Sequence, residues 1–197
     1  LVCAPKSRLS PSWNHRRRRA SSHRHIMARP IVSCVTGATG FLASELVAQL
    51  LARGHTVRAT VRSLANAERN TCLTSLTGAA QRLTLHEADL LNDGSFDDPV
   101  RGCDYVFHTA SPFIATSRAV NDPQHELFAP ALEGTRSVFR AVTRSVAAGH
   151  APPARVVLTS SVAAVFGMSE LASRAADEPF TEDDGTSRRR RRAIRPA

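Results

Sequence analysis

A glycine-rich segment between a strand pattern and a helix pattern constrains the fold of this chain more than any other part of its sequence. The segment, residues 35–43, reads VTGATGFLA and overlaps the end of the β-branched apolar run IVSCVT. Apolar residues at helical spacing then fill residues 41–53. Gly37 permits a tight turn, Gly40 leaves room for an anion to approach backbone amides at the start of the helix, and Ala43 is small enough for close helix-to-strand packing. In this strand–turn–helix context the pattern predicts a turn that binds the pyrophosphate of a dinucleotide.

Strand and helix patterns alternate along the rest of the chain. Gly54 ends the first helix pattern, in the position that glycine favours. We expect further strands at His55–Val61, Arg82–Ala88, Tyr105–Ala110 and Arg155–Ser161, and further helices at Asn66–Leu76 and Glu126–Ala147. Strands separated by helices predict an α/β protein with an NAD(P)-binding Rossmann fold, in which a doubly wound parallel sheet is covered on both faces. No strand pattern follows Phe166, so we expect the C-terminal strands and the substrate-binding part of such a fold to be missing.

The net charge of +9 comes from the two ends of the chain. Residues 1–30 hold eight basic side chains and residues 188–197 hold six, whereas all 17 acids lie between these two segments. The segment 31–187 therefore keeps 12 basic residues and carries a formal charge of −5. His23-Arg24-His25 and the arginine runs in these ends lack interleaved aromatic residues and any motif that reads bases, so we expect no nucleic-acid partner.

The same ends set the expected domain boundaries. Residues 1–29 have no hydrophobic periodicity and are rich in Arg, Ser and His, which predicts a disordered basic tail. Two explanations of this tail stay open: an organellar transit peptide, or translated sequence upstream of a start at Met27, which we favour. Residues 30–184 form the expected partial Rossmann domain, and residues 185–197 form a second basic tail.

Neither a membrane segment nor a metal centre is indicated. No uninterrupted apolar run approaches the roughly 20 residues that a membrane helix needs. The four cysteines, Cys3, Cys34, Cys72 and Cys103, are widely separated and form no Cys-x-x-Cys pair. We therefore expect reduced thiols, no metal ion and a cytoplasmic location, whereas a genuine transit peptide in residues 1–26 would place the protein in an organelle.

The residues after the second strand pattern bear on which dinucleotide binds. Enzymes that prefer NAD usually carry an acid there, on the ribose 2′-hydroxyl, but this chain has the sequence Val61-Arg62-Ser63. Arg62 is suited to pair with a 2′-phosphate through its charged fork, and Arg69 follows in the same region. We therefore expect NADP(H), with NAD(H) as the alternative cofactor. The competing interpretation is that Arg58, Arg62 and Arg69 are solvated surface residues.

Four segments resemble, in order and spacing, the extended short-chain dehydrogenases/reductases of the NAD-dependent epimerase/dehydratase superfamily. They are VTGATGFLASELVAQLLARGHTVRATVR, EADLLNDGSFDDPVRGCDYVFHTASP, ALEGTRSV and RVVLTSSVAAV. The likeness is to the dihydroflavonol 4-reductase and cinnamoyl-CoA reductase group, and it runs from Pro30 to about Asp184. It implies an NADP-dependent oxidoreductase that transfers hydride between the cofactor and a small carbonyl or alcohol substrate.

The resemblance also implies roles for individual residues. The pyrophosphate would be lined by Gly37, Thr39, Gly40, Phe41 and Leu42, and the 2′-phosphate by Arg62 and Arg69. The adenine would be flanked by Asp89 and Leu90, and the nicotinamide side by Thr109, Ala110 and Ser111. Ser161 would be the catalytic serine, which hydrogen-bonds the substrate carbonyl. The alternative for Ser160 and Ser161 is a strand end capped by hydroxyl groups.

The sequence departs from the family at the remaining catalytic residues. In the family a tyrosine donates a proton and a lysine four positions later lowers the pKa of that tyrosine, yet this chain has a single tyrosine, Tyr105, and a single lysine, Lys6. Because Tyr105 begins a predicted strand, we expect that it cannot substitute. We expect a truncated or intron-containing gene model and hence an inactive fragment; the alternative is a non-catalytic dinucleotide-binding or sensor protein. His108, in the same strand pattern, is expected to be a packed histidine rather than a base.

Overall fold

Five parallel strands form one sheet in the part of the chain that this computed structural model describes, residues 29–112, 120–165 and 178–181. Their order in space is β3-β2-β1-β4-β5. Their bounds are Val32–Thr36 for β1, Thr56–Val61 for β2, Leu83–Glu87 for β3, Tyr105–His108 for β4 and Arg155–Leu158 for β5. Apolar and β-branched residues dominate the central strands, as expected of a parallel sheet that is covered on both faces. The predicted α/β fold with a parallel Rossmann-type sheet is confirmed.

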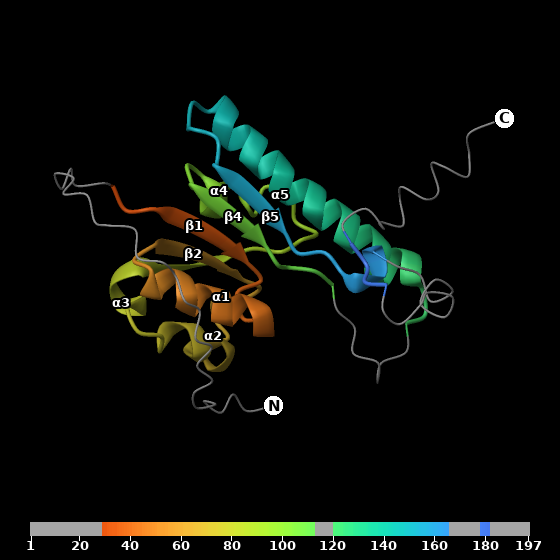
Figure 1. The fold of residues 1–197 in the computed structure, drawn as a ribbon, viewed down its shortest axis with the longest axis horizontal. Coiled ribbons are helices and arrows are strands. Elements are labelled where there is room, and N and C mark those ends of the chain that lie inside the picture. Colours follow the sequence, from red (N-terminus) through yellow and green to blue (C-terminus); the bar gives the residue numbers. More distant parts are fainter. Residues whose placement is uncertain (1–28, 113–119, 166–177, 182–197) are drawn as a thin grey trace.

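Helices cover both faces of the sheet (Figure 1). One face carries α1 (Phe41–Ala52), α2 (Ala67–Thr74) and α3 (Ala79–Arg82), and the other carries α4 (Asp97–Val100) and α5 (Ala129–Ala147). A π-helical turn, Gln124–Phe128, leads into α5, and a 3-10 turn, Val162–Ala164, follows β5. Side chains alternate along β1, so Cys34 packs in the core beneath α4 and α5 while Val35 packs in the core beneath α1.

The winding of the chain reverses at β1. From β1 the chain passes through α1 to β2 and then to β3, and it later returns to pair β4 with the other side of β1. Because all pairings are parallel, the carboxyl ends of the strands lie at one edge of the sheet. Doubly wound sheets bind ligands outside this edge, where the strand order reverses. The glycine-rich turn after β1 lies at this point.

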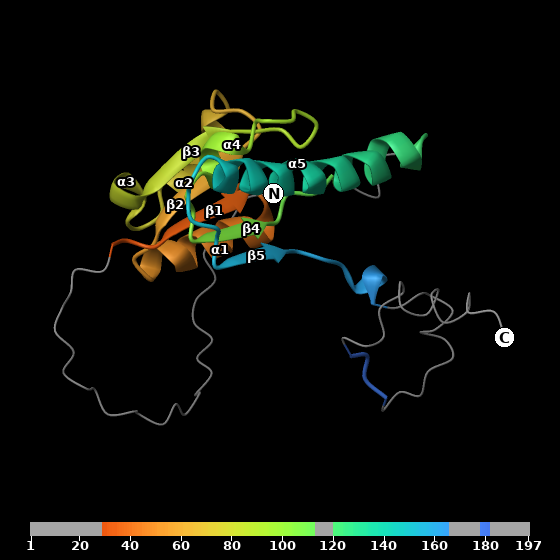
Figure 2. The ribbon, with the colours of Figure 1, turned by 90° about the horizontal axis from the view of Figure 1, so that it is seen from above.

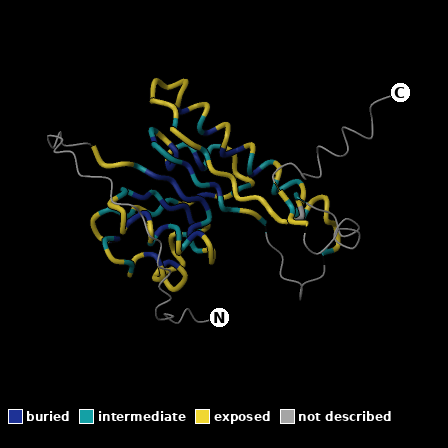
Figure 3. Tube along the Cα trace, viewed as in Figure 1, coloured by how far each residue is buried: buried dark blue, intermediate teal, exposed yellow. Residues whose placement is uncertain are grey.

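The burial of the strands differs across the sheet. β1 is fully buried from Ser33 to Thr36, whereas Val157 and Leu158 of β5 remain 44% and 48% exposed (Figure 3). Figure 2 shows β5 at the margin of the sheet, beyond β4. Within the described residues, β5 is therefore an edge strand with apolar side chains in contact with solvent.

The observed bounds differ from the expected ones where a strand meets a turn. The third strand begins at Leu83, because Arg82 is the last residue of α3. The Arg82 guanidinium donates to the carbonyl oxygen of Leu51 at 2.9 Å. The fifth strand ends at Leu158, before Ser161. Helices α3 and α4 have four residues each, too few for hydrophobic periodicity to reveal.

The expectations for the two tails concern residues that lie almost entirely outside the described part of the chain. Arg29, the last residue of the expected N-terminal tail, is described and pairs with Asp104, to which its Nη1 donates at 3.0 Å. None of the described helices is both long enough and apolar enough to span a membrane.

Candidate dinucleotide-binding site

The turn after β1 requires glycine at its first position. Gly37 has a φ of +65°, in the left-handed region, and a Cβ added there would lie 3.0 Å from both Cα and Cβ of Ala110. The turn is fastened to β2, since the Gly37 N–H donates to Thr60 Oγ1 at 3.1 Å and the Ala38 N–H donates to the Thr60 carbonyl at 2.8 Å. A third bond, from the Gly40 N–H to the Gly37 carbonyl at 2.9 Å, closes the turn.

Helix α1 begins directly after this turn with no side-chain cap. Gly40 occupies the N-cap position, and the first helical bond runs from the Ser44 N–H to the Gly40 carbonyl at 2.9 Å. The N–H groups before Ser44 are those that helix geometry leaves without a partner in the helix, and they lie at its positive end. Ala43 is 2% exposed and packs toward the sheet, whereas the Phe41 ring is 99% exposed. Turn and helix together offer an anion several backbone donors.

The loop after β2, which carries Arg62, is held from two sides. Glu87 accepts a bond from the Leu64 N–H at 2.9 Å through Oε2. The Asn70 side-chain amide donates to the carbonyl oxygens of Ser63 at 3.1 Å and Leu64 at 3.3 Å, and Asn70 is only 5% exposed. The backbone that carries Arg62 is therefore fixed before any ligand binds.

The three arginines considered for the 2′-phosphate behave differently. Arg58 is committed elsewhere, because its Nη1 donates to the carbonyl oxygens of Arg101 at 2.7 Å and Asp98 at 3.3 Å. Arg62 and Arg69 are exposed, and neither guanidinium has an ion pair or hydrogen bond among the described residues. Their charges remain accessible to a ligand at this edge of the sheet.

Asp89 and Leu90 follow β3 and are held by the neighbouring loop and by α5. Asp89 accepts the Leu91 N–H at 2.8 Å through Oδ1, and Ser95 donates its hydroxyl to the Asp89 carbonyl at 2.9 Å. Leu90 packs against Gly134 of α5, where an added Cβ would lie 2.7 Å from Leu90 Cβ and Cδ2. The side chain of Leu90 is therefore packed on α5, and the Asp89 carboxylate is exposed at the loop.

The segment after β4 is bonded to the end of β1. The N–H groups of Thr109 and Ala110 both donate to Thr36 Oγ1, at 3.1 and 3.0 Å, and the Thr109 hydroxyl donates to the Thr36 carbonyl. Ser111 follows and is exposed. His108 is 1% exposed, so the prediction of a packed histidine is confirmed.

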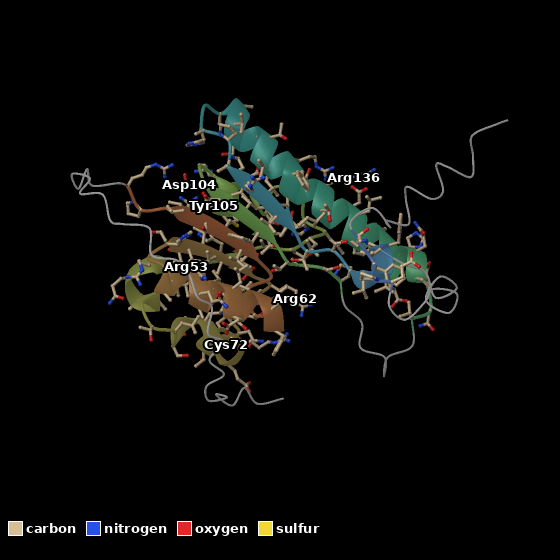
Figure 4. The ribbon with its side chains drawn as sticks, viewed as in Figure 1. Arg53, Arg62, Cys72, Asp104, Tyr105 and Arg136 are labelled. Atoms are coloured by element: carbon tan, nitrogen blue, oxygen red, sulfur yellow. The ribbon has the colours of Figure 1, made fainter. Side chains whose placement is uncertain are left out.

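Ser161 lies just beyond the carboxyl end of β5, whereas Tyr105 lies at the amino end of β4. Ser161 follows the carboxyl end of β5 and is exposed, and its carbonyl accepts the Ala164 N–H at 2.9 Å. Tyr105 begins β4, where it pairs with Arg155 at the amino end of β5, and its ring lies 6.3 Å from that of His55. Figure 4 shows Tyr105 at the opposite end of the sheet from Arg62. Tyr105 is therefore remote from the edge where the other candidate residues gather.

The strand order arranges the candidate residues along that edge. Asp89 and Leu90 come first, after β3, and are followed by Arg62 after β2 and by the glycine turn after β1. The segment Thr109–Ser111 after β4 and then Ser161 after β5 complete the row. This order spreads the candidate residues on both sides of the switch point at β1, where doubly wound sheets bind dinucleotides.

Four residues that shape this edge are not among the residues predicted from the sequence: Thr36, Asn70, Glu87 and Gly134. Gly134 alone has a recognisable sequence signal, because a glycine inside a long helix pattern often has a packing role. The contacts of Thr36, Asn70 and Glu87 are made with residues distant in sequence or in neighbouring loops. Among the described residues, no group of three or more His, Cys, Asp or Glu side chains is placed to hold a metal ion.

Proteins of known identity resemble this chain over the described domain. A cinnamoyl-CoA reductase (CAD2) of Medicago truncatula is 51% identical over 156 residues, which cover 78% of this chain and 45% of the relative. A dihydroflavonol 4-reductase of Hordeum vulgare is 42% identical over 160 residues, which cover 81% of this chain and 42% of the relative. The chain thus spans less than half the length of these curated relatives.

Solved structures of reductases share the fold of this chain. The yeast methylglyoxal/isovaleraldehyde reductase Gre2, in complex with NADPH, has a TM-score of 0.60 and 30% identity over 71% of this chain and 40% of that chain. Gre2 of Candida albicans, also in complex with NADPH, has a TM-score of 0.60 and 35% identity over the same shares. The family model described as "NAD dependent epimerase/dehydratase family" matches residues 33–190. The resemblance predicted from the sequence is confirmed, and the chain belongs to the NAD dependent epimerase/dehydratase family.

Proposed function

We propose that this chain binds NADP(H) along the carboxyl edge of its sheet, as the cofactor-binding part of a reductase of small or phenylpropanoid-like carbonyl compounds. One observation carries the proposal: two accessible arginines, Arg62 and Arg69, follow β2, and the glycine turn that is bonded to Thr60 of β2 opens an uncapped helix. An anion-binding helix start suits a pyrophosphate, and guanidinium groups suit a 2′-phosphate. NAD(H) is the alternative cofactor.

The absence of an acid after β2 supports NADP(H) over NAD(H). Val61 ends the strand and Arg62 follows it, so no carboxylate directly after β2 is available for a free ribose 2′-hydroxyl. The two Gre2 structures that resemble this chain are complexes with NADPH. The loop that carries Arg62 is fixed by Asn70 and Glu87, which lowers the entropy lost when a phosphate binds there.

Each remaining residue of the edge has a part in this proposal. The pyrophosphate lies along Gly37, Thr39, Gly40, Phe41 and Leu42. The N–H groups of Gly37 and Gly40 are already bonded within the protein, so the donors are those of Thr39, Phe41 and Leu42. Asp89 and Leu90 flank the adenine, and Thr109–Ser111 passes beneath the nicotinamide. Ser161 donates a hydrogen bond to the substrate carbonyl. NADP(H) supplies the hydride when it is bound.

We further propose that these 197 residues by themselves do not sustain efficient turnover. Tyr105 lies at the amino end of β4, and no other tyrosine is available as a proton donor beside Ser161. General acid catalysis typically contributes about 10²–10⁴-fold. The lack of a second tyrosine also favours another candidate function, a dinucleotide-binding or sensor protein without catalysis.

Titration with NADPH and NADH tests the cofactor proposal. We expect the protein to bind NADPH more tightly than NADH. Arg62→Ala should lower the affinity for NADPH by about tenfold or more and leave the affinity for NADH unchanged, since a charge-assisted bond contributes about 1.5–3 kcal/mol. Arg136→Ala is the matched control, because Arg136 is an exposed arginine of α5 that pairs with Glu133. Equal affinity of the unmodified protein for the two cofactors would contradict the proposal.

A turnover assay tests the proposal that these residues do not sustain efficient catalysis. Reduction of an aldehyde or ketone at rates typical of intact reductases would overturn the claim of inactivity. NADPH binding with no reduction of any tested carbonyl would favour the sensor function.

A further inference from the structure

A buried hydroxyl at the end of β1 collects an unusual number of hydrogen bonds. Thr36 is 0% exposed, and its Oγ1 accepts the N–H groups of Thr109 at 3.1 Å and Ala110 at 3.0 Å. The same oxygen lies 2.9 Å from Nδ1 of His108. Thr36 therefore joins the glycine turn, which begins at the next residue, to the segment that follows β4.

These contacts determine where the protons lie. A hydroxyl group has one hydrogen and two lone pairs. Since two backbone N–H groups occupy both lone pairs of Thr36 Oγ1, its hydrogen must point to His108 Nδ1, which must then be unprotonated. His108 is therefore neutral and carries its hydrogen on Nε2.

The other ring nitrogen of His108 agrees with this assignment. Nε2 lies 3.3 Å from Thr135 Oγ1 on α5, and Thr135 donates its own hydrogen to the Ala131 carbonyl at 2.8 Å. Thr135 Oγ1 thus keeps a lone pair for the hydrogen on Nε2. Burial also lowers the pKa of His108, in the direction that keeps the ring neutral.

We propose that His108 is a positioning residue: its neutral Nε2–H tautomer aligns the Thr36 hydroxyl so that Thr109 and Ala110 are held against the glycine turn before the cofactor binds. The inference rests on the proposed cofactor site. Ala110 packs against Gly37, at the distance where a Cβ on Gly37 would touch it, so a small movement of Thr109–Ala110 changes the shape of the turn. A protonated ring would present a third donor to Thr36 and break the arrangement.

The same strand contains a matched pair that serves as a control. At the amino end of β1, Ser33 Oγ lies 2.8 Å from His55 Nδ1, and Ser33 is also 0% exposed. This pair has the same chemistry as Thr36 and His108 but lies at the edge of the sheet away from the glycine turn. Its loss is expected to reduce stability without changing the affinity for NADPH.

The tautomer is tested first, on the cofactor-free protein at neutral pH. Long-range proton–nitrogen correlation NMR distinguishes the two neutral tautomers and the charged imidazolium ring. We expect His108 to show the Nε2–H pattern. An Nδ1–H pattern or a charged ring would overturn the inference whatever the cofactor affinity is.

Affinity for NADPH is tested with substitutions at the two hydroxyls of β1. Thr36→Val, which leaves two buried N–H groups without an acceptor, is expected to weaken NADPH by about tenfold or more. Thr36→Ser restores the hydroxyl and is expected to stay within about threefold of the unmodified protein. Ser33→Ala is expected to leave the affinity unchanged.

The outcomes separate this inference from the proposed function. If the unmodified protein does not bind NADPH, the proposed function fails and the role of His108 in it fails as well. If the unmodified protein binds NADPH and folded Thr36→Val binds it equally well, only the positioning role is overturned. If Thr36→Val does not fold, folded Thr36→Ser decides: affinity and the Nε2–H pattern kept together support the inference, and full affinity without that pattern, or lost affinity with it, overturns it.

Discussion

Gly134 of α5 lies directly against Leu90, in the loop after β3. A Cβ at position 134 would be 2.7 Å from Cβ and Cδ2 of Leu90, and at least one of the two groups would have to move. Thr135, the next residue of α5, faces His108 at the end of β4. One turn of α5 therefore contacts both the segment after β3 and the last residue of β4, on the two flanks of the proposed cofactor site.

Gly134→Ala is expected to destabilise the protein by about 1 kcal/mol, because overpacking costs about 1–3 kcal/mol and exceeds the helix propensity that alanine adds. Displacement of Leu90 should also weaken NADPH binding. Urea unfolding and cofactor titration measure the two effects. In a double-mutant cycle, Leu90→Ala removes Cδ2 but keeps Cβ, so it should relieve part of the overlap and make the combined loss smaller than the sum of the single losses. A Gly134→Ala protein more stable than the unmodified one would contradict this account of the contact.

Asn70→Ala is expected to loosen the loop that carries Arg62. The change removes donors from the carbonyl oxygens of Ser63 and Leu64 and should cost about 1–2 kcal/mol of stability. It should also reduce the preference for NADPH over NADH, since the loop is no longer fixed. Asn66→Ala is the control, because it removes a hydrogen bond from the same helix, the cap to the Arg69 N–H, and leaves the bonds to Ser63 and Leu64 in place. The prediction fails if Asn70→Ala retains the cofactor preference of the unmodified protein.

Stability is expected to fall as the pH drops from about 7 to about 5. Burial lowers the pKa of His108, and the same cause lowers those of His55 and His86. An unfolded histidine titrates near 6.5, so below that pH the unfolded chain takes up protons that the folded protein does not, which favours unfolding. The slope from His108 is at most about 1.4 kcal/mol per pH unit.

Urea unfolding at a series of pH values measures this dependence. His108→Asn removes the titrating group while keeping an acceptor near the position of Nδ1, and it should flatten the profile between about pH 7 and about pH 5. A variant as pH-dependent as the unmodified protein would show that the slope comes from other groups.

The three cysteines in the described part of the chain should differ sharply in reactivity. Cys72 is exposed, whereas Cys34 and Cys103 are buried. Burial raises the pKa of the Cys103 thiol to about 11, and burial together with neighbouring Cys103 raises that of Cys34 well above its usual value. Iodoacetamide at neutral pH should therefore modify Cys72 and spare Cys34 and Cys103 until urea unfolds the domain. Peptide mapping by mass spectrometry assigns each site, and early modification of Cys34 in native buffer would contradict the observed packing.

The sequence by itself determined the parallel α/β fold, the family and the segments that form the carboxyl edge of the sheet. These follow from local signals: apolar periodicity, and glycines at a strand-to-helix turn such as Gly37. The position of Tyr105 at the start of a strand was also readable, because one apolar run gives the beginning of β4 to within a residue.

Only the tertiary structure decided how that edge is held in shape. Thr36 and His108 are 72 residues apart in the sequence, and nothing local predicts that their side chains meet. The same holds for Gly134 and Leu90, which come together because α5 packs on the sheet beside β4 and β1. The tertiary structure also distinguished Arg58, which donates to the carbonyl oxygens of Asp98 in α4 and of Arg101 after it, from the accessible Arg62. Hydrogen bonds and close contacts depend on distances that strand pairing and helix packing set together, so sequence patterns locate the candidate cofactor site while packing fixes its geometry.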